Sequence, residues 1–582
     1  MYIFIKEVRA LLGSQAKALP LIIFLFLFLA VVELASIGLM APYVAFIANP
    51  EVDGGSLGVV INVFKMFIEP DMLLIVIGLC LFILYTIKSL SGIFISYYIV
   101  NFSMRQQTLL RERVMTAHQS IKYEKYLSLN SADFLYDMQI LIPRFSENVL
   151  FFGLKTVSNS LVAVAISALL FFVNSFAFIS MIGVLGLFAF IYDRFFRVKA
   201  KEFGILANLS AANMVKGVNE SNEGMKEIRV LGSEKYFFDV VKENSIKFGK
   251  YNTKTTVMSL MPRYLLEIIL ITFLVIFVVI QNQAQGSLET IVLFATAGLR
   301  LIPIVNEIMS TFLQFRISRD AVSRLYNNLS KQNASTSIKL NTSQKNDLLF
   351  KSIKLHNVDF TYPNSNYSAL SGINLEINSG ESIGFIGASG SGKTTLIDIL
   401  LGLLTPKKGS VILNNGLLKE QVRTWHDNVA YLPQEVFLTD NTLACNIAMG
   451  VASSDIDYTK LKLAISKANL TDLIELLPEG LETRVGERGA RISGGQRQRV
   501  ALARAFYFER SVLIMDEATS ALDAASEFEI NEEIKLLKGT ITIIVIAHRL
   551  STVKSCDRIY KMEKGRIVSL GSSREMLGDE SN

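Results

Sequence analysis

A glycine-rich segment at residues 387–394, GASGSGKT, fits the phosphate-binding pattern G-x-x-x-x-G-K-[ST]. In such a loop the backbone N–H groups cradle phosphate oxygens. Lys393 would reach the β- and γ-phosphates, and the Thr394 hydroxyl could hold Mg²⁺. The apolar run 382–386 predicts a buried strand before the loop. The periodic run from Thr395 predicts a helix after it, so the phosphates would lie at a helix N-terminus.

Two carboxylates follow a second apolar run, VLIMDE at residues 512–517. Buried strands rarely end in paired acids without a cation or a reacting water beside them. Asp516 suits Mg²⁺ bound through a water, and Glu517 suits polarising the water that attacks a γ-phosphate. The two runs together predict a nucleoside triphosphatase.

Two more segments add phosphate contacts. ISGGQ at residues 492–496 precedes a helix expected over 497–506, with Ser493 at the N-cap and glycines that let the backbone approach a phosphate. The β-branched run 540–547 predicts a strand that ends at His548. A lone histidine is more often structural, but this position after the strand favours contact with the γ-phosphate.

These motifs, in this order over about residues 350–575, resemble the ATPase domain of ABC transporters. The resemblance implies ATP and Mg²⁺ as cofactors, and it implies catalytic roles for Glu517 and His548. Metal contacts would come from Thr394, Gln434 and Asp516. The residues implied around the nucleotide are Tyr362, Gly387, Ala388, Ser389, Gly390, Ser391, Gly392, Lys393, Thr394, Thr395, Gln434, Ser493, Gly494, Gly495, Gln496 and Asp523. Ile492 replaces the usual leucine of the signature, and no catalytic position is degenerate.

The rest of the chain has the composition of a membrane protein. Of its 582 residues 51% are hydrophobic, and the mean hydropathy is +0.39. The net charge of +6 is modest, and the sequence has no basic patch with interleaved aromatics, so no nucleic-acid partner is expected. Three scattered cysteines argue against a disulfide framework or a metal cluster.

Six apolar segments precede the ATPase, each long enough to cross a bilayer. They lie at about 21–47, 72–100, 149–173, 176–196, 257–280 and 290–315. Lysines and arginines before the first span and after the second and fourth place both termini in the bacterial cytoplasm. Residues 57–67 suit either an interfacial helix or a packed loop.

The expected fold class is an α-helical six-span transmembrane domain followed by an α/β P-loop ABC ATPase, the type I (type IV) exporter architecture. The transmembrane domain would cover 1–327, with helical extensions at 102–148 and 197–256. A polar linker would cover 328–349, and the nucleotide-binding domain 350–582. The turns at 123–126 and 224–238 resemble the coupling segments of exporters.

Ionisable residues inside spans are costly and therefore suggest function. Arg300 and Glu33 lie deep, whereas Lys88 and Arg263 lie nearer the cytoplasmic edge, where snorkelling is an equal alternative. Arg300 could simply pair with Glu33. Arg263 could pair with Glu267 one turn away.

The sequence around these residues resembles that of bacterial lipid-linked oligosaccharide flippases of the PglK type. In those proteins basic residues on the cavity wall contact the pyrophosphate of a polyprenyl carrier. The resemblance implies flipping of such a lipid-linked glycan within membrane lipids. Export of drugs, peptides or other lipids is the alternative, and an ATP-gated channel or regulator is a further one. One phosphate loop and one signature per chain require two chains, most simply a homodimer.

Overall fold

The computed structural model describes residues 2–48, 70–129, 131–283, 288–333, 349–363, 365–517, 524–547 and 550–577. The expected segment 57–67 and most of the expected linker lie outside these ranges. The chain forms two compact units. The first comprises Met1–Ser120 with Asn130–Ile338, and the second comprises Ile121–Leu129 with Lys339–Asn582.

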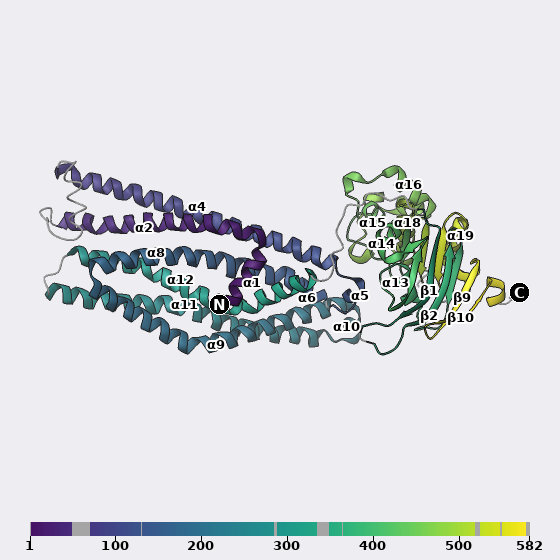
Figure 1. The fold of residues 1–582 in the computed structure, drawn as a ribbon, viewed down its shortest axis with the longest axis horizontal. Helices are drawn as coiled ribbons and strands as arrows, with labels where there is room; N and C mark the ends of the chain where they lie inside the picture. Colours follow the sequence, from purple (N-terminus) through teal and green to yellow (C-terminus); the bar gives the residue numbers. More distant parts are fainter. Residues whose placement is uncertain are drawn as a thin grey trace. The chain divides into compact units, whose positions relative to one another are not determined.

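The first unit is helical, and its long helices run alongside one another (Figure 1). Its helices are α1 (Tyr2–Leu12), α2 (Leu19–Ala48), α4 (Pro70–Gln119), α6 (Ser131–Tyr136), α7 (Ile142–Arg144), α8 (Phe152–Val173), α9 (Ser175–Glu223), α10 (Met225–Leu231), α11 (Glu234–Gln283) and α12 (Leu288–Asn333). A 3₁₀ segment, Gly13–Ala18, joins α1 to α2, and π-helical segments flank α7.

Six helices within the described residues are long and apolar enough to cross a membrane, as the sequence predicts. Their outward surfaces carry large apolar side chains: Phe172 and Phe176 are each 84% exposed. Such surfaces are stable in lipid and not in water. The predicted turn between the third and fourth spans is confirmed, and the side chain of Asn174 caps α9 by accepting from the Ala177 N–H at 3.0 Å.

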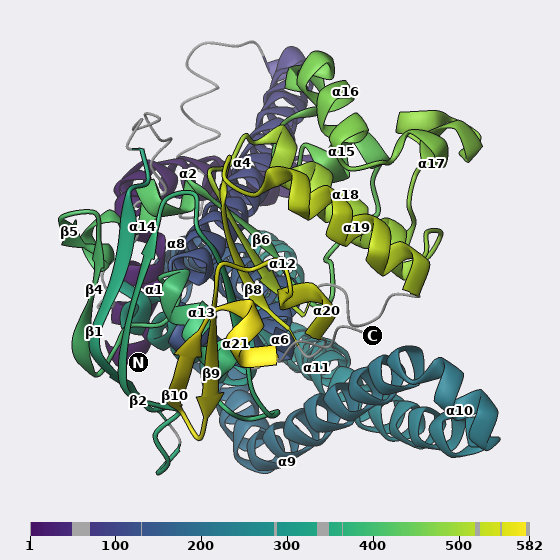
Figure 2. The ribbon, with the colours of Figure 1, turned by 90° about the vertical axis from the view of Figure 1, so that its right-hand side faces the viewer.

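The predicted extensions of the spans are continuous helices. α4 runs to Gln119, while α9 and α11 lie side by side and are joined through α10 (Figure 2). Gly232 ends α10 in the left-handed conformation, at φ +64°, which glycine adopts without strain. The chain reverses there, so that α11 can return along α9.

The second unit contains two sheets. The antiparallel sheet has the order β2-β1-β4-β5, and the other sheet has the order β10-β9-β3-β8-β7-β6. Their strands are β1 (Ser352–Phe360), β2 (Leu370–Asn378), β3 (Ser382–Ile386), β4 (Lys408–Leu413), β5 (Gly416–Leu417), β6 (Val429–Leu432), β7 (Val512–Asp516), β8 (Thr542–Ile546), β9 (Arg558–Glu563) and β10 (Arg566–Gly571).

Continuous apolar runs form the centre of the second sheet. Every residue of β7 and β8 is buried, and β3, β6, β7, β8 and β9 pair in parallel. Parallel strands need cover on both faces, which explains why these runs do not alternate with polar residues. One face packs against α13 (Lys393–Leu400), and the other packs against α15 (Leu443–Ile447), α16 (Tyr458–Lys467) and α18 (Gly494–Tyr507).

The second unit also includes a short helix from the first half of the chain, α5 (Tyr123–Tyr126). Its Tyr123 side chain is partly buried against the cluster that contains Phe360 and Phe385. Burial, with a smaller contribution from the Asp398 carboxylate, raises the pKa of Tyr123. The segment 121–129 therefore belongs to the second unit and packs against its core through Tyr123.

Candidate active site

The strand order brings the predicted phosphate loop and the predicted acids to one edge. β3 pairs with β8, and β8 pairs with β7, all in parallel. The loop at 387–392 follows β3, and Asp516 ends β7. Because parallel strands end at the same edge of a sheet, the loop and the acids face a common space.

The glycines of the loop allow contacts that a side chain would prevent. A Cβ at Gly387 would lie 2.3 Å from the Met562 carbonyl oxygen. One at Gly392, where φ is +100°, would lie 2.7 Å from that of Ala369. Ser391 is buried, and its hydroxyl has no hydrogen-bond partner among the described residues. A tight loop with an unsatisfied buried hydroxyl fits a bound phosphate chain.

Lys393 begins α13, as the motif predicts, and its side chain is buried. Its Nζ donates to the carbonyl oxygens of Gly387 at 2.8 Å and Ala388 at 3.0 Å. These bonds hold the cation inside the curve of the loop. Ser389 and Gly390 lie at the exposed tip. The arrangement fits a ligand whose phosphates lie against the loop and the first turn of α13.

The acids lie close to this lysine. Burial lowers the pKa of Lys393, whereas Glu517 and Asp516 act to raise it. Glu517 has a left-handed backbone, at φ +50°, and its Oε2 accepts from Gln434 Nε2 at 3.3 Å. A non-glycine residue in that conformation is typical of functional sites. Sequence reasoning missed Tyr431, whose hydroxyl donates to Asp516 Oδ2 at 3.4 Å.

Tyr362 lies on the other side of the loop. Its hydroxyl and the Thr395 hydroxyl are 3.1 Å apart, and its half-buried ring packs edge-on against Phe360. Thr394 is exposed beside them at the start of α13. The ring position fits the adenine contact that the sequence predicts.

Asp398, which sequence reasoning also missed, lies behind the loop on α13. Burial, and then the negative charge of Asp516, raises its pKa to about 6. The site therefore holds more carboxylates than Lys393 alone neutralises, which suits a divalent cation.

The signature segment begins α18 earlier than the sequence predicted, at Gly494 instead of Arg497. Ser493 is the N-cap: the Gln496 N–H donates to its hydroxyl oxygen at 3.3 Å, and its own N–H donates to Gln496 Oε1 at 2.8 Å. This capping box occupies Ser493 and Gln496. Gly494 and Gly495 form the first helical turn. Asp523 and His548 lie outside the described residues.

The second unit thus contains the predicted phosphate loop, the predicted pair of acids and the predicted signature helix in their expected order. The family profile described as "ABC transporter" matches residues 370–520. An "ATP-dependent lipid A-core flippase" of Saccharophagus degradans is 30% identical over 506 residues, which are 85% of this chain and 83% of that protein. The chain belongs to the ABC transporter family.

Two further similarities differ in extent. A protein of the same description from Ralstonia nicotianae is 40% identical over 227 residues, which are 39% of this chain and only 38% of that protein. A solved bacterial Atm1-family ABC exporter with ATP bound superposes with a TM-score of 0.76 at 18% identity, over 97% of this chain and 96% of that one. This ABC transporter therefore has the predicted fold: six apolar helices, then an α/β P-loop ATPase. It is a multi-pass membrane protein that hydrolyses ATP to export an amphiphilic substrate.

The membrane unit of this ABC transporter contains an ion cluster formed by three of the four predicted substrate residues. Glu33 on α2 is 1% exposed, and its Oε1 lies 3.0 Å from Lys88 Nζ on α4. Arg300 on α12 donates from Nη2 to Oε2 at 3.0 Å, and its Nε pairs with Oε1. Lys88 also lies over the ring of Tyr85, 4.9 Å from the centroid.

The cluster, defined as Glu33, Lys88 and Arg300, has two cations and one carboxylate, so its net charge is 2 − 1 = +1. The pairing that sequence reasoning left open for Arg300 is therefore present, and its guanidinium is not an isolated charge. Arg263 is apart from this arrangement: its Nε pairs with Glu267 Oε1 at 3.3 Å, one turn along α11. That pair is balanced and exposed.

An ion pair between α8 and α12 was not predicted. Lys155 on α8 lies 3.0 Å from Glu307 on α12, and Asn159 donates to the other oxygen of Glu307 at 2.9 Å. This pair carries one charge of each sign. Unlike the Glu33 cluster it has no surplus charge, so it is a useful comparison for it.

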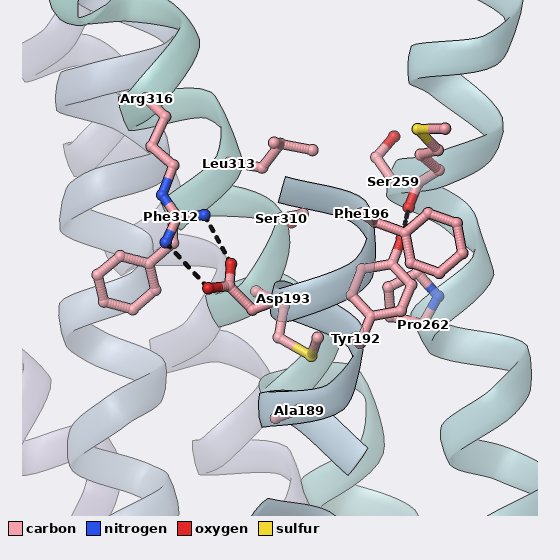
Figure 3. A pocket seen from close by; sticks show the side chains of 12 residues that line it. Ala189, Tyr192, Asp193, Phe196, Ser259, Pro262, Ser310, Phe312, Leu313 and Arg316 are labelled. Carbon is pink, nitrogen blue, oxygen red and sulfur yellow. Dashed lines mark hydrogen bonds and ion pairs between the residues drawn. The ribbon is translucent and has the colours of Figure 1, made fainter. Parts of the chain in front are cut away.

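A cavity of about 320 Å³ lies between α9, α11 and α12 (Figure 3). Arg316 and Asp193 pair across it, at 2.6 Å between Nη1 and Oδ1. The Tyr192 hydroxyl donates to the backbone oxygen of Met258. Met258 stands four residues before Pro262, whose missing N–H leaves that oxygen without its helical donor. Polar side chains of α9 thus tie α9 to both neighbouring helices.

Proposed function

We propose that this ABC transporter flips a polyprenyl-pyrophosphate-linked oligosaccharide, or a related glycolipid, between the leaflets of a bacterial cytoplasmic membrane. The observation that carries the proposal is the net positive ion cluster inside the spans. A surplus cation within the bilayer is costly unless an anion meets it. The phosphates of a lipid-linked sugar are such an anion.

The geometry of the cluster leaves donors for this anion. Arg300 uses Nε and Nη2 on Glu33, and its Nη1 has no hydrogen bond to a described residue. The Lys88 ammonium has three protons and pairs with a single carboxylate oxygen. Glu33 is almost fully buried, whereas the Arg300 and Lys88 side chains are 42% and 17% exposed. The cations therefore lie in front of the carboxylate, accessible to a phosphate.

The relatives named as lipid A-core flippases support a lipid cargo, and they favour this proposal over export of a drug or peptide. Export of another lipid is the second candidate. A channel or regulator is disfavoured because Glu517 stands in place beside Lys393 and Gln434. Arg263 keeps a proposed role as a further contact, since its pair with Glu267 is exposed and can exchange.

The protein would act as a homodimer, and both termini of each chain would lie in the cytoplasm. Each chain has one phosphate loop and one signature, so Ser493 of one chain would face the loop of the other. Mg²⁺ would be held by Thr394, Gln434 and Asp516, and Asp523 and His548 would complete the site. When bound, MgATP supplies the phosphoanhydride that is hydrolysed. Glu517 would accept a proton from, or orient, the attacking water.

The test uses proteoliposomes that contain a fluorescent lipid-linked oligosaccharide and a quencher confined to one side. Arg300→Ala should lower ATP-dependent flipping about tenfold or more, as expected for the loss of a charged hydrogen bond to phosphate. Glu33 keeps Lys88 as its partner in this variant, so the carboxylate is not left unpaired. Arg300→Lys should retain part of the transport, because the charge remains without the planar fork.

The matched control is Lys155→Ala, which removes a paired cation from the same unit without touching the cluster. It should transport at close to the rate of the unaltered protein. Equal losses in Lys155→Ala and Arg300→Ala would reject the assigned site. If the unaltered protein moves an uncharged drug or a peptide but leaves the glycolipid in place, the cargo proposal fails.

A further inference from the structure

We infer that Glu33 is a specificity-determining residue: it lowers the charge of the cluster so that lipids with one negative charge are refused and those with two are accepted. The inference rests on the proposed function, because it names the class of headgroup that the same site selects. It concerns the carboxylate that lies behind the cations.

A flippase for a rare anionic lipid works within a large excess of ordinary phospholipids. Many of these carry one negative charge on a phosphodiester, whereas a pyrophosphate diester carries two. A site that attracts any phosphate would be occupied by bulk lipid. Specificity against an abundant competitor needs an element that weakens binding of the competitor.

The position of Glu33 suits that role. Its side chain is 1% exposed and contacts both cations, so it neutralises one positive charge without occupying the accessible side of the cluster. Coulomb attraction scales with the product of the charges. With Glu33 the cluster is +1, and the products are −1 for a phosphodiester and −2 for a pyrophosphate diester. The attraction of the cluster for the doubly charged headgroup is therefore twice its attraction for the singly charged one at the same distance.

Without the carboxylate charge the cluster would be +2, and a phosphodiester would reach the product −2. A variant that lacks this charge should therefore respond to a singly charged lipid much as the unaltered protein responds to a doubly charged one. Glu33→Gln is the suitable change, because it keeps the shape of the side chain and an oxygen that can accept a hydrogen bond.

The Glu307–Lys155 pair offers a matched control. Glu307→Gln adds the same increment of charge to the same helical unit, but at a balanced pair that becomes +1 and not +2. A general effect of charge in the spans would appear in both variants. An effect on the selecting cluster would appear only in Glu33→Gln.

The measurement is ATPase activity in nanodiscs of phosphatidylcholine with increasing phosphatidylglycerol, each variant normalised to its own rate in pure phosphatidylcholine. The unaltered protein and Glu307→Gln should give flat curves. The normalised ATPase rate of Glu33→Gln should change by about fivefold as phosphatidylglycerol increases, because one added basic charge contributes about that factor to the binding of an anionic lipid. A flat curve for correctly folded Glu33→Gln would overturn the inference.

A double variant tests the charge count itself. Glu33→Gln with Lys88→Gln removes one charge of each sign and returns the cluster to +1, so its curve should again be flat. A phosphatidylglycerol response in this variant would refute the charge count. The double variant also tests the charge count if Glu33→Gln alone does not fold. The double variant lacks the carboxylate too, but it leaves one unpaired cation instead of two.

The failure of this inference is distinguishable from that of the proposed function. A synthetic polyprenyl-pyrophosphate sugar, added to the unaltered protein, reports on the cargo. Phosphatidylglycerol, added to Glu33→Gln, reports on the filter. If the sugar lipid has no effect but Glu33→Gln gains the phosphatidylglycerol response, the filter stands and the glycan cargo is rejected. The opposite pair of results keeps the cargo and rejects the filter.

Discussion

Tyr192→Phe should destabilise the membrane unit through a single backbone oxygen. The Tyr192 hydroxyl donates to the carbonyl of Met258, which has lost its helical partner because Pro262 has no N–H (Figure 3). Leaving a buried acceptor without a donor costs about 1–3 kcal/mol. Tyr192 is half-buried beside the cavity, so water can partly replace the hydroxyl. We therefore expect a loss near the lower limit, about 1 kcal/mol.

Pro262→Ala provides the decisive background. An alanine at 262 has an N–H that can donate to the Met258 oxygen as an ordinary helical bond. In that background Tyr192→Phe should be nearly neutral, so that the two changes show a coupling free energy of about 1 kcal/mol. The assay is reversible unfolding in mixed micelles, followed by circular dichroism for the four proteins of the cycle.

The control is Tyr264→Phe, which removes an exposed hydroxyl from α11, the helix that contains Met258 and Pro262; this hydroxyl bonds to no described residue. It should leave the free energy of unfolding unchanged. Equal losses from Tyr192→Phe in the proline and alanine backgrounds would refute the reasoning. In that case the hydroxyl would stabilise the unit by some route other than the proline-freed carbonyl.

Three further predictions concern the ATPase unit. Glu517→Gln should lower ATP turnover about 100-fold or more while ATP still binds, whereas Lys393→Ala should weaken ATP binding itself. Measurements of turnover and of equilibrium nucleotide binding separate the two effects. Near-normal turnover by Glu517→Gln would exclude the role of Glu517 in activating the attacking water. Mixed dimers of Lys393→Ala and Ser493→Arg chains retain one intact composite site and should hydrolyse ATP faster than either parent; verified heterodimers with no such recovery would contradict a shared site. Asp398→Asn should raise the melting temperature at pH 7–8. The native pKa of this carboxyl is raised from 3.8 to about 6, so its charge opposes folding above about pH 6, and the benefit should vanish as the pH falls below 4. Allowing for solvent screening, the gain is about 1 kcal/mol, and a gain that persists at pH 3.5 would contradict this cause.

Most of the ATPase unit could be predicted from the sequence because its signals are local. The strand predicted at 382–386 is β3, and Asp516 ends β7 where the apolar run ends. Ser493 is the N-cap that its residue type indicated. A phosphate loop is a contiguous segment whose glycines and lysine act through their own backbone, so spacing alone specifies it. The start of α18 was missed by three residues because glycines in a first helical turn look like loop.

Contacts between distant segments could not be predicted in this way. Periodicity locates Tyr431 on a strand, but only the pairing of β6 with β7 places its hydroxyl near Asp516. The raised pKa of Asp398 arises from burial and, to a smaller extent, from the charge of the same Asp516. Tyr192 and Met258 stand 66 residues apart, on helices whose rotation the composition does not determine.

The membrane charges show most clearly what this limit means for function. From the sequence, an arginine near the middle of a span suggests a substrate ligand because it lacks a visible partner. In the folded unit Arg300 has a partner, and the argument shifts from an isolated charge to the balance of a cluster. One buried carboxylate serves two cations from different helices, so neither cation can be assigned without counting the other. A balanced pair such as Lys155 with Glu307 holds helices together and has no electrostatic need for a ligand. A cluster with a surplus charge does have such a need, and for this reason charge balance within the spans, more than the presence of a charged residue, indicates where an anionic cargo would bind.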